Sequence, residues 1–187
     1  MIHETAIVED GADLGDKVHV WAFTQVRSGA TVGEGTTIGS HSYIDTDVTI
    51  GARCKIQTGV RIFRGATLAG GVFVGPGCII NNDLRPRAVN ADGSMKGADN
   101  WTVTDTHIDT GASLGSGSII LAGAHIGAFA LIGAGATVTR VVAAHAIVVG
   151  GSARQTGWAC HCGERLQEDD EGWRCLVCHK TVPIPSQ

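Results

Sequence analysis

The chain has few aromatic residues, no run of positive charge and no long apolar stretch. Aromatic side chains make up 5% of its 187 residues, as expected for a narrow interior filled by aliphatic side chains. The net charge is −4 and no basic run occurs, which argues against nucleic acid or an anionic membrane as a partner. No apolar stretch is long enough to span a bilayer, and no N-terminal signal pattern occurs. The expected location is the cytoplasm.

What the sequence has in plenty is glycine, at 27 residues, and a column of aliphatic residues at every sixth position. The column runs without a failure from Ile2 to Ile80 and resumes from Ile108 to Val138. The residue two positions before each aliphatic is usually Ala, Ser, Thr, Val or Cys. A period of six fits neither a helix nor a simple strand, so it describes one face of a larger coil.

Each hexad can supply a short strand and a corner, so three hexads close a triangular turn of about 18 residues. The aliphatic residue then points to the axis, and successive turns pair as parallel strands about 4.8 Å apart. Glycines directly follow many of the aliphatics, and we expect them at corners with strained backbone conformations: Gly15, Gly33, Gly39, Gly51, Gly75, Gly115, Gly127 and Gly133. The predicted fold is an all-β parallel β-helix.

This pattern resembles the hexapeptide-repeat acyltransferases over residues 1–153. The resemblance implies a left-handed parallel β-helix. The handedness follows from the resemblance alone, because crossovers between parallel strands are ordinarily right-handed.

The hexad column fails between Ile80 and Ile108, whose separation is not a multiple of six. The chain must therefore leave the prism in an excursion loop over residues 82–101 and return in a new phase. Long loops in a regular scaffold usually carry function, and a tolerated surface insertion is the alternative.

Residues 73–83 read Phe-Val-Gly-Pro-Gly-Cys-Ile-Ile-Asn-Asn-Asp, and Pro86-Arg87 follow. This run resembles the nucleotide-sugar N-acetyltransferases that modify 3-amino sugars for bacterial surface polysaccharides. The greatest similarity is to the family that acetylates UDP-2-acetamido-3-amino-2,3-dideoxyglucuronate. Asn81 stands where that family usually has Thr, a modest departure that affects one side contact.

The resemblance implies that Asn82 is the catalytic asparagine, which orients the sugar amine by hydrogen bonding because an amide has no useful basicity. The departing CoA sulfur, with a thiol pKa of about 8.5, is then the final proton acceptor. Asp83 either orients the amine or caps the loop turn. Arg85 and Arg87 are candidates for the uronate carboxylate or the diphosphate, with solvated loop arginines as the alternative.

The relatives thread acetyl-CoA along the groove between neighbouring prisms, which implies a homotrimer. Ser116 and Ala134 match the corners that contact the cofactor, with plain corner geometry as the alternative. Arg140 matches the position where the relatives commonly have a Lys or Arg that contacts the phosphates of the CoA nucleotide. Ala122 is a further candidate for contact with the cofactor. Trp101 either stacks on the uracil or anchors the returning loop, and we favour the anchor. Residues 148–154 resemble the family's Gly-Asn-Pro-Ala-Arg ending without its Asn and Pro.

The hexads stop after Ala153, and residues 154–187 are rich in Cys, His and acidic side chains. A C-x-C pair and a C-x2-C pair suit a structural Zn²⁺ in a zinc-ribbon-like tail, with four ligands: Cys160, Cys162, Cys175 and Cys178. His161 or His179 can replace one of these ligands. Similar tails occur on some of the acetyltransferases named above. Cys54 and Cys78 fall at small-residue positions of the hexad and are expected in the core.

Two other functions compete with sugar acetylation. His107 and His125 are 18 positions apart, so they should stack on one face and could share a metal with a neighbouring chain, as in a metalloenzyme of the γ-type carbonic-anhydrase kind. Against this, no second histidine follows His125 within a few residues, and two exposed histidines are the simpler explanation. The third possibility is a non-enzymatic adaptor, with the zinc-ribbon-like tail mounted on a rigid prism.

Overall fold

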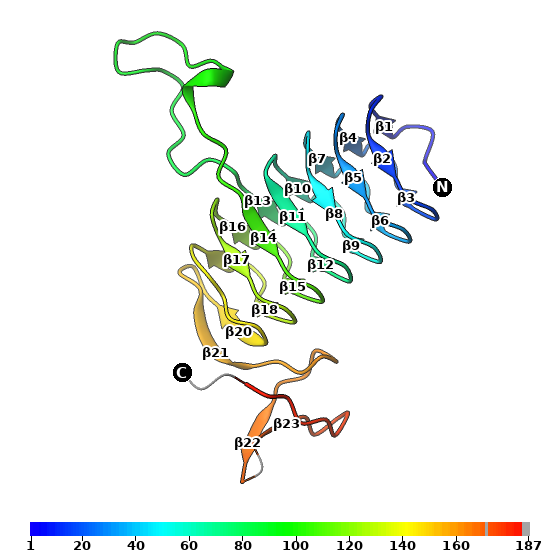
Figure 1. The fold of residues 1–187 in the computed structure, drawn as a ribbon, viewed down its shortest axis with the longest axis vertical. Helices are drawn as coiled ribbons and strands as arrows, with labels where there is room; N and C mark the ends of the chain where they lie inside the picture. The colour runs from blue at the N-terminus through cyan, green and yellow to red at the C-terminus, as the bar shows by residue number, and fades with distance from the viewer. Residues whose placement is uncertain (171, 185–187) are drawn as a thin grey trace.

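The computed structural model describes residues 1–170 and 172–184 and shows parallel strands coiled into a three-sided prism (Figure 1). The expected all-β parallel β-helix is confirmed. The described residues contain one 3-10 turn, η1 (Ala98–Asn100), and no α-helix. No helix in this part of the chain is long and apolar enough to cross a membrane. The left-handed sense of the coil rests on the family resemblance.

Every third strand belongs to the same side of the prism, and the sides are named here face 1, face 2 and face 3. Face 1 contains β1 (Ile7–Val8), β4 (Gln25–Val26), β7 (Tyr43–Ile44), β10 (Arg61–Ile62), β13 (Ile79–Ile80), β16 (Ile119–Ile120) and β19 (Thr137–Val138). Face 2 contains β2 (Asp13–Leu14), β5 (Thr31–Val32), β8 (Thr49–Ile50), β11 (Ala66–Leu68), β14 (Thr106–Ile108) and β17 (His125–Ile126). Face 3 contains β3 (His19–Val20), β6 (Thr37–Ile38), β9 (Lys55–Ile56), β12 (Phe73–Val74), β15 (Ser113–Leu114), β18 (Leu131–Ile132), β20 (Ala146–Val149) and β21 (Arg154–Trp158).

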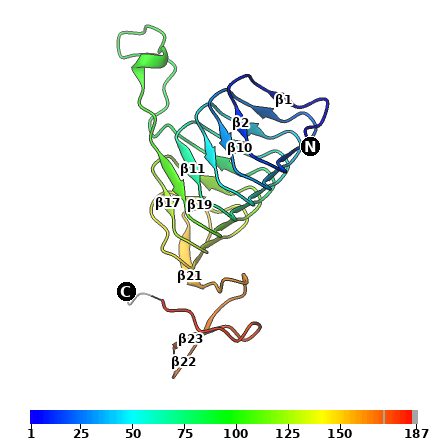
Figure 2. The same cartoon turned by 45° about the vertical axis from the view of Figure 1, so that its right-hand side comes forward.

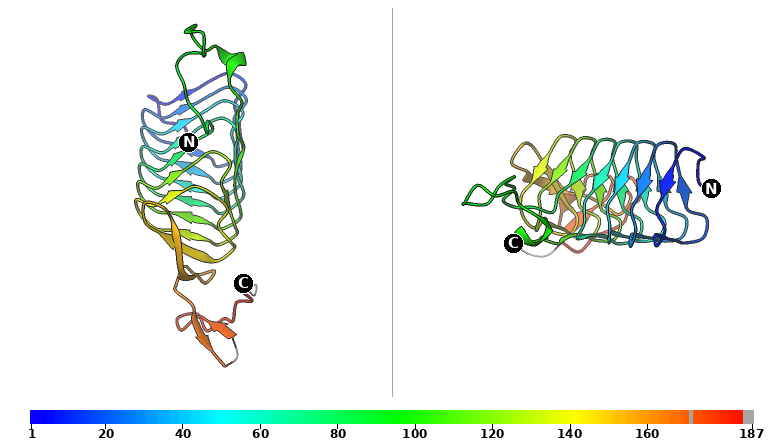
Figure 3. Two further views of the ribbon diagram at one scale, coloured as in Figure 1. Left: turned by 90° about the vertical axis from the view of Figure 1, so that its left-hand side faces the viewer. Right: turned by 90° about the horizontal axis from the view of Figure 1, so that it is seen from above.

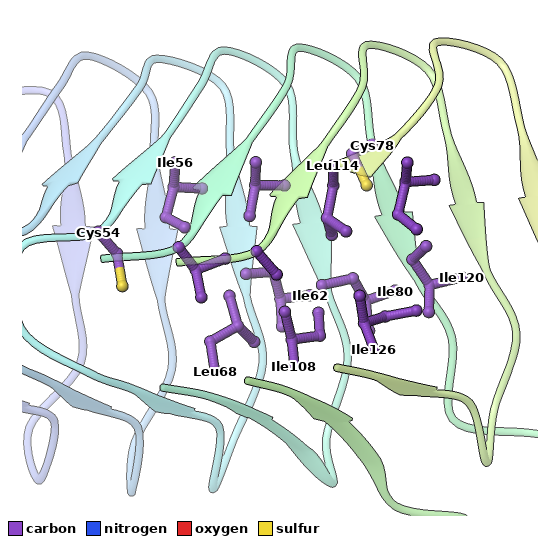
Figure 4. Close-up of a cluster of buried hydrophobic side chains, with 14 of the residues drawn as sticks. Cys54, Ile56, Ile62, Leu68, Cys78, Ile80, Ile108, Leu114, Ile120 and Ile126 are labelled. Atoms are coloured by element: carbon purple, nitrogen blue, oxygen red, sulfur yellow. The ribbon is translucent and has the colours of Figure 1, made fainter. Parts of the chain in front are cut away.

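The aliphatic column forms the core, as its period predicts. Arg61 of β10 pairs with Ile79 of β13, one coil further on, so like positions of the hexad stack. The largest fully buried side chains all belong to this column: Ile38, Ile44, Ile50, Ile56, Ile62, Leu68, Ile80, Ile108, Leu114, Ile120, Ile126 and Ile132. Figure 4 shows several of them side by side along the axis, with Cys54 and Cys78 among them. Both cysteines are buried, as expected, and burial raises the pKa of the Cys78 thiol to about 11.

The glycines that follow the aliphatic residues are required for a reason other than the expected one. None of them has a positive φ. Instead they lie against the backbone of the next coil: a Cβ on Gly75 would meet Ser116 N at 2.6 Å. The left-handed conformation occurs at a different hexad position, which glycine shares with other residues such as Lys17 and Phe23. The expectation of strained backbone at the first set of glycines was therefore wrong, because close packing of coils excludes their side chains.

The excursion loop leaves the prism between β13 and β14, at the edge between face 1 and face 2 (Figure 2). Across it the paired residues Ile80 and Ile120 are 40 positions apart instead of 18, so the loop adds 22 residues to one coil. The main chain of Asn82 accepts a hydrogen bond from Thr104 N at 2.9 Å. The two ends of the loop are thus joined, and the coils on both sides continue in register.

The coil ends at β20, where the chain reverses and β21 pairs with it antiparallel. The expected boundary between residues 153 and 154 falls just before β21, which still belongs to face 3. The hairpin of β22 (Gln167–Asp169) and β23 (Gly172–Arg174) follows. Figure 3 shows this tail beyond the last coil, away from the N-terminus. Of the expected tail, residues 171 and 185–187 lie outside the described residues.

Candidate functional site

One edge of the prism collects several of the expected site residues. Asn82, Ala122 and Arg140 each follow a paired face 1 aliphatic by two positions, in three consecutive coils. They therefore stack along the edge between face 1 and face 2, which is named here the loop corner. Arg140 is exposed, whereas Ala122 is only 3% exposed and leaves little side chain for a cofactor to contact.

The excursion loop above this corner has a defined internal structure. Residues 88–96 form a small hairpin, in which Lys96 N donates to Ala88 O at 3.0 Å and Val89 bridges Met95. Its tip is closed by Asp92, whose Oδ1 accepts from Ser94 N at 3.0 Å. The Ser94 hydroxyl also donates to Asp92 and lowers the pKa of this carboxyl. Hydrogen bonds of this kind fix the loop without a hydrophobic core.

At the loop base, Asn81, Asn82 and Asp83 are half-buried. The Asn81 amide donates to Ile120 O at 3.3 Å, so this side chain is bound to the prism. Asp83 Oδ1 accepts a hydrogen bond from Arg85 N at 2.7 Å. This is the geometry of a side chain that caps a loop turn, one of the two roles considered for Asp83 from the sequence. Asp83 also lines both of the hollows described next.

Two hollows lie on the loop, of about 430 and 230 Å³. Arg87 lines the larger and Arg85 the smaller, and both side chains are exposed. Arg87 Nη1 donates to Pro86 O at 3.0 Å. Trp101 lines both hollows and is 37% exposed, so its ring is accessible to a ligand. The structure thus brings together Asp83, Arg85, Arg87 and Trp101.

Ser116 and Ala134 lie at a different edge of the prism. They follow β15 and β18 and precede face 1, and Gly135 N donates to Ser116 O at 2.9 Å between the two coils. Both side chains are exposed. In one chain, face 1 separates this edge, named here the Ser116 corner, from Asn82 and Arg140 at the loop corner. A single prism therefore does not bring all the expected cofactor residues together.

His107 and His125 stack on face 2, as their spacing predicts, with ring centroids 6.1 Å apart. His125 Nε2 is 2.9 Å from Asp109 Oδ2, and both side chains are about half exposed. The structure adds no third metal ligand to this pair, because the only group of three or more such side chains among the described residues is the cysteine cluster. Exposed histidines flanking the column describe this pair better than a metal site.

The four tail cysteines converge. Their sulfur atoms all lie within 4.8 Å of one another, with Cys160 Sγ 3.4 Å from Cys178 Sγ and Cys162 Sγ 3.6 Å from Cys175 Sγ. Burial raises the pKa of the Cys160 thiol to about 12. The N–H of Cys178 points at Cys175 Sγ and lowers the pKa of that thiol to about 7. Such a set of convergent thiols is typical of a metal centre.

His161 does not join the cysteines as a ligand. Its ring lies 4.4 Å from the Phe129 ring and 4.7 Å from the His145 ring, between centroids. His145 is buried, with Nδ1 2.8 Å from Ala159 O. This cluster fastens the tail to the last coils. No sequence pattern predicted this cluster, because its members lie far apart in the chain.

The structure also shows residues that the sequence did not single out. Arg64 is one coil before Asn82 at the loop corner and pairs with Asp47 at 3.2 Å. Lys96 lines both hollows of the loop. Arg154 shares a hollow of about 430 Å³ with Arg140 at the end of the coil. The loop hairpin brings Lys96 to its place and the chain reversal brings Arg154 to its place, and neither has a periodic sequence pattern.

Family models of known proteins match the same six-residue repeats in this chain. The family model described as bacterial transferase hexapeptide (six repeats) matches residues 11–46 and 29–64. A second model, hexapeptide repeat of succinyl-transferase, matches residues 107–140. These matches cover the prism on both sides of the excursion loop and leave the loop itself unmatched.

Two curated proteins illustrate the similarity. The bifunctional protein GlmU of Alkalilimnicola ehrlichii is 32% identical over 173 residues, which cover 81% of this chain and 37% of that protein. An acyl-[acyl-carrier-protein]–UDP-N-acetylglucosamine O-acyltransferase of Brucella ovis is 44% identical over 55 residues, which cover 29% of this chain and 20% of that protein. The chain thus spans well under half the length of these relatives.

Two solved structures share the fold. The acetyltransferase domain of PglB from Neisseria gonorrhoeae has a TM-score of 0.56 at 14% identity, covering 81% of this chain and 57% of its own. WeeI from Acinetobacter baumannii has a TM-score of 0.52 at 22% identity, covering 79% of this chain and 56% of its own. In its repeats and its coil, the chain is similar to the hexapeptide-repeat transferases of bacteria, whose family models match residues 11–64 and 107–140.

Proposed function

We propose that the chain transfers an acetyl group from acetyl-CoA to the 3-amino group of a nucleotide-linked amino sugar. The proposed substrate is UDP-2-acetamido-3-amino-2,3-dideoxyglucuronate, used in the cytoplasm for bacterial surface polysaccharide. One observation carries the proposal: the loop leaves the prism at half-buried Asn82 and Asp83, beside two hollows lined by cations. A uronate or a diphosphate needs such cations, and an amine needs the polar groups at the base.

In this mechanism, the amine nitrogen attacks the thioester carbonyl, a C–N bond forms and the C–S bond breaks. The side-chain carbonyl of Asn82 accepts a hydrogen bond from the amine and aims its lone pair, and holding two reactants in this way lowers the barrier. Asp83 Oδ2 can accept a second hydrogen bond from the amine. The departing CoA thiolate takes the proton that the amine loses, since its pKa of about 8.5 suits a final acceptor.

The names of the relatives support a substrate of this class. The Brucella protein is named as acting on UDP-N-acetylglucosamine, with an acyl group carried by acyl carrier protein. PglB and WeeI agree with this chain in fold alone. The acetyl group and the UDP moiety of the proposed substrate rest on the resemblance of residues 73–87 and not on these proteins.

A homotrimer would complete the site. The Ser116 corner and the loop corner are separated by face 1 within one prism, so the expected cofactor residues do not meet in one chain. A neighbouring prism that sets its Ser116 corner beside this chain's loop corner would bring the thioester to the amine. The separation of the two corners is therefore a reason to expect intersubunit sites.

A structural Zn²⁺ fits the four tail cysteines. Zn–S bonds of about 2.3 Å in a tetrahedron require sulfur atoms about 3.8 Å apart. The sulfur separations of 3.4 and 3.6 Å, and the limit of 4.8 Å for the whole cluster, agree with this requirement. Cys160, Cys162, Cys175 and Cys178 would hold the ion, which would stabilise a tail too small to build its own core.

The test is to incubate the protein with acetyl-CoA and a panel of UDP- and dTDP-linked 3-amino sugars while free thiol is measured. The proposal expects thiol release with the 3-amino uronate, and a product heavier by one acetyl group. A matched sugar that carries a 3-hydroxyl serves as the control and should release no thiol. Thiol release at background level with every amino sugar would refute the proposed function.

A further inference from the structure

The two hollows of the excursion loop are two halves of one surface. Asp83, Lys96 and Trp101 line both of them. Arg87, Ala88, Met95 and Gly97 complete the larger, and Leu84, Arg85, Thr102 and Thr104 complete the smaller. Asp83, Lys96 and Trp101 therefore stand at the boundary, where a ligand that fills both halves must cross.

The loop hairpin holds Lys96 at this boundary. Its N–H donates to Ala88 O at 3.0 Å, one residue beyond the bridge between Val89 and Met95. Lys96 is half-buried, whereas Arg85 and Arg87 on either side of it are exposed. No ion pair of Lys96 occurs among residues 1–170 and 172–184. A half-buried ammonium without a carboxylate partner is available to an anion.

The charge of the surface favours an anionic ligand. Three cations line the two halves, Arg85, Arg87 and Lys96, and the one carboxylate is Asp83. Asp83 lies at the loop base, next to Asn82, so its carboxylate borders the place proposed for the sugar amine. Arg87 lines only the larger half and Arg85 only the smaller, so cations lie in both halves as well as at Lys96.

Trp101 supplies the aromatic part. It is 37% exposed, between the two halves, and Met95 in the larger half is 76% exposed. An indole that is partly open to solvent suits stacking with a planar base, because every base has a π-face. The larger half, at about 430 Å³, has the size of a small-ligand site.

We infer that Lys96 and Trp101 form a nucleoside diphosphate cradle on the loop. The base stacks on Trp101 in the larger half, Lys96 binds the diphosphate at the boundary, and the smaller half directs the sugar toward Asp83. The choice of ligand rests on the proposed function. Lys96 acts as a substrate-binding residue in this arrangement, because it contacts the diphosphate, which uridine lacks.

The test measures binding by calorimetry and needs no acetyl transfer. UDP and uridine are the probes, with four proteins: wild type, Lys96→Met, Lys96→Arg and Lys55→Met. Lys55 is exposed on β9 of face 3 and is the matched control. The cradle predicts that wild type binds UDP more tightly than uridine. Lys96→Met should weaken UDP binding about tenfold, the order of one charge-assisted contact, and leave uridine binding unchanged. Lys96→Arg should keep most of the UDP affinity, and Lys55→Met all of it.

Trp101→Phe tests the aromatic half and keeps a ring at the loop base. It should weaken UDP and uridine alike, with an unchanged melting temperature. The inference is overturned if wild type binds neither probe, if Lys96→Met binds UDP as Lys55→Met does, or if uridine binds as tightly as UDP. Lys96-dependent UDP binding without acetylation of any amino sugar would support the cradle and refute the proposed function. Acetylation of an amino sugar, together with UDP binding that does not depend on Lys96, would support the proposed function and refute the cradle.

Discussion

Gly115 and Gly117 lie two residues apart at the Ser116 corner, yet they should respond very differently to a methyl group. A Cβ on Gly115 would contact Ala134 N and lie 2.7 Å from both Gly133 C and Ile132 O, which are backbone atoms of the next coil. Gly117 has a φ of +66° and nothing within 4 Å of an added Cβ. A side chain at position 115 is excluded by the lack of space between coils. A side chain at position 117 is disfavoured only by the backbone conformation.

The expected magnitudes follow from these two limits. Overpacking costs about 1–3 kcal/mol, and Gly115→Ala should reach about 3 kcal/mol because backbone atoms cannot rotate away. A left-handed Ala at Gly117 costs about 1–2 kcal/mol, and the loss of chain entropy in the unfolded state returns about 0.4–1 kcal/mol. Gly117→Ala should therefore cost about 1 kcal/mol. Lys17 and Arg53 already adopt φ of 56° at the equivalent position of other hexads.

The assay is urea unfolding followed by circular dichroism, with the free energies of unfolding of both variants compared with wild type. Gly117→Asn is the matched control and should be close to neutral, because Asn tolerates the left-handed region. A loss for Gly117→Ala that equals or exceeds the loss for Gly115→Ala would refute the packing argument. It would mean that backbone conformation and not the spacing of coils selects both glycines.

Three further predictions follow from the site and the core. Asn82→Ala should lower kcat for acetyl transfer about 100-fold through loss of amine orientation with an unchanged melting temperature, whereas His125→Ala should keep wild-type kcat. Ile62→Ala should destabilise the coil by about 2–5 kcal/mol and Ile62→Val by about 0.5–1.5 kcal/mol, as measured by urea unfolding, because Ile62 is fully buried. Protein purified without chelators should contain one zinc per chain by elemental analysis, and Cys175→Ser should lose it, since tetrahedral zinc needs all four sulfur ligands.

Each of these has a clear contrary result. Wild-type turnover in Asn82→Ala would remove its proposed role, and loss of activity in His125→Ala would favour a histidine base oriented by Asp109. Equal effects of the two Ile62 substitutions would contradict a closely packed column. Absence of zinc from wild type, or full zinc content in Cys175→Ser, would overturn the metal assignment.

The core could be predicted from the sequence because each coil repeats one local rule. An aliphatic residue at the sixth position points to the axis regardless of its neighbours, so Ile38 and Ile132 occupy the same environment in different coils. The role of the glycines could not be inferred from the same pattern. Gly75 and Gly77 look alike in the sequence, but one faces the next coil and the other has a φ of +68°. That distinction depends on the contact between coils, which no single hexad contains.

The site could be predicted in part. The interruption of the six-residue period after Ile80 located the loop. The similarity to the family then pointed to Asn82, Arg85 and Arg87 as candidates. Lys96 was missed because a hairpin within the loop, and not a repeat, sets its position. The pairing of Phe129 with His161 was missed because the chain reversal after β20 brings the tail back to the prism. Periodic patterns predict where regular structure stops and do not predict how an irregular segment folds.

The central claim is that the excursion loop carries the acetyl transfer site, and deletion of the loop tests it most directly. The hydrogen bond between Asn82 O and Thr104 N shows that the loop ends already meet, so residues 84–101 can be replaced by two glycines with the coils left in register. The account predicts a melting temperature close to wild type and a rate of thiol release from acetyl-CoA at least about 100-fold lower with the 3-amino uronate. A folded deletion variant that acetylates the sugar at the wild-type rate would contradict it.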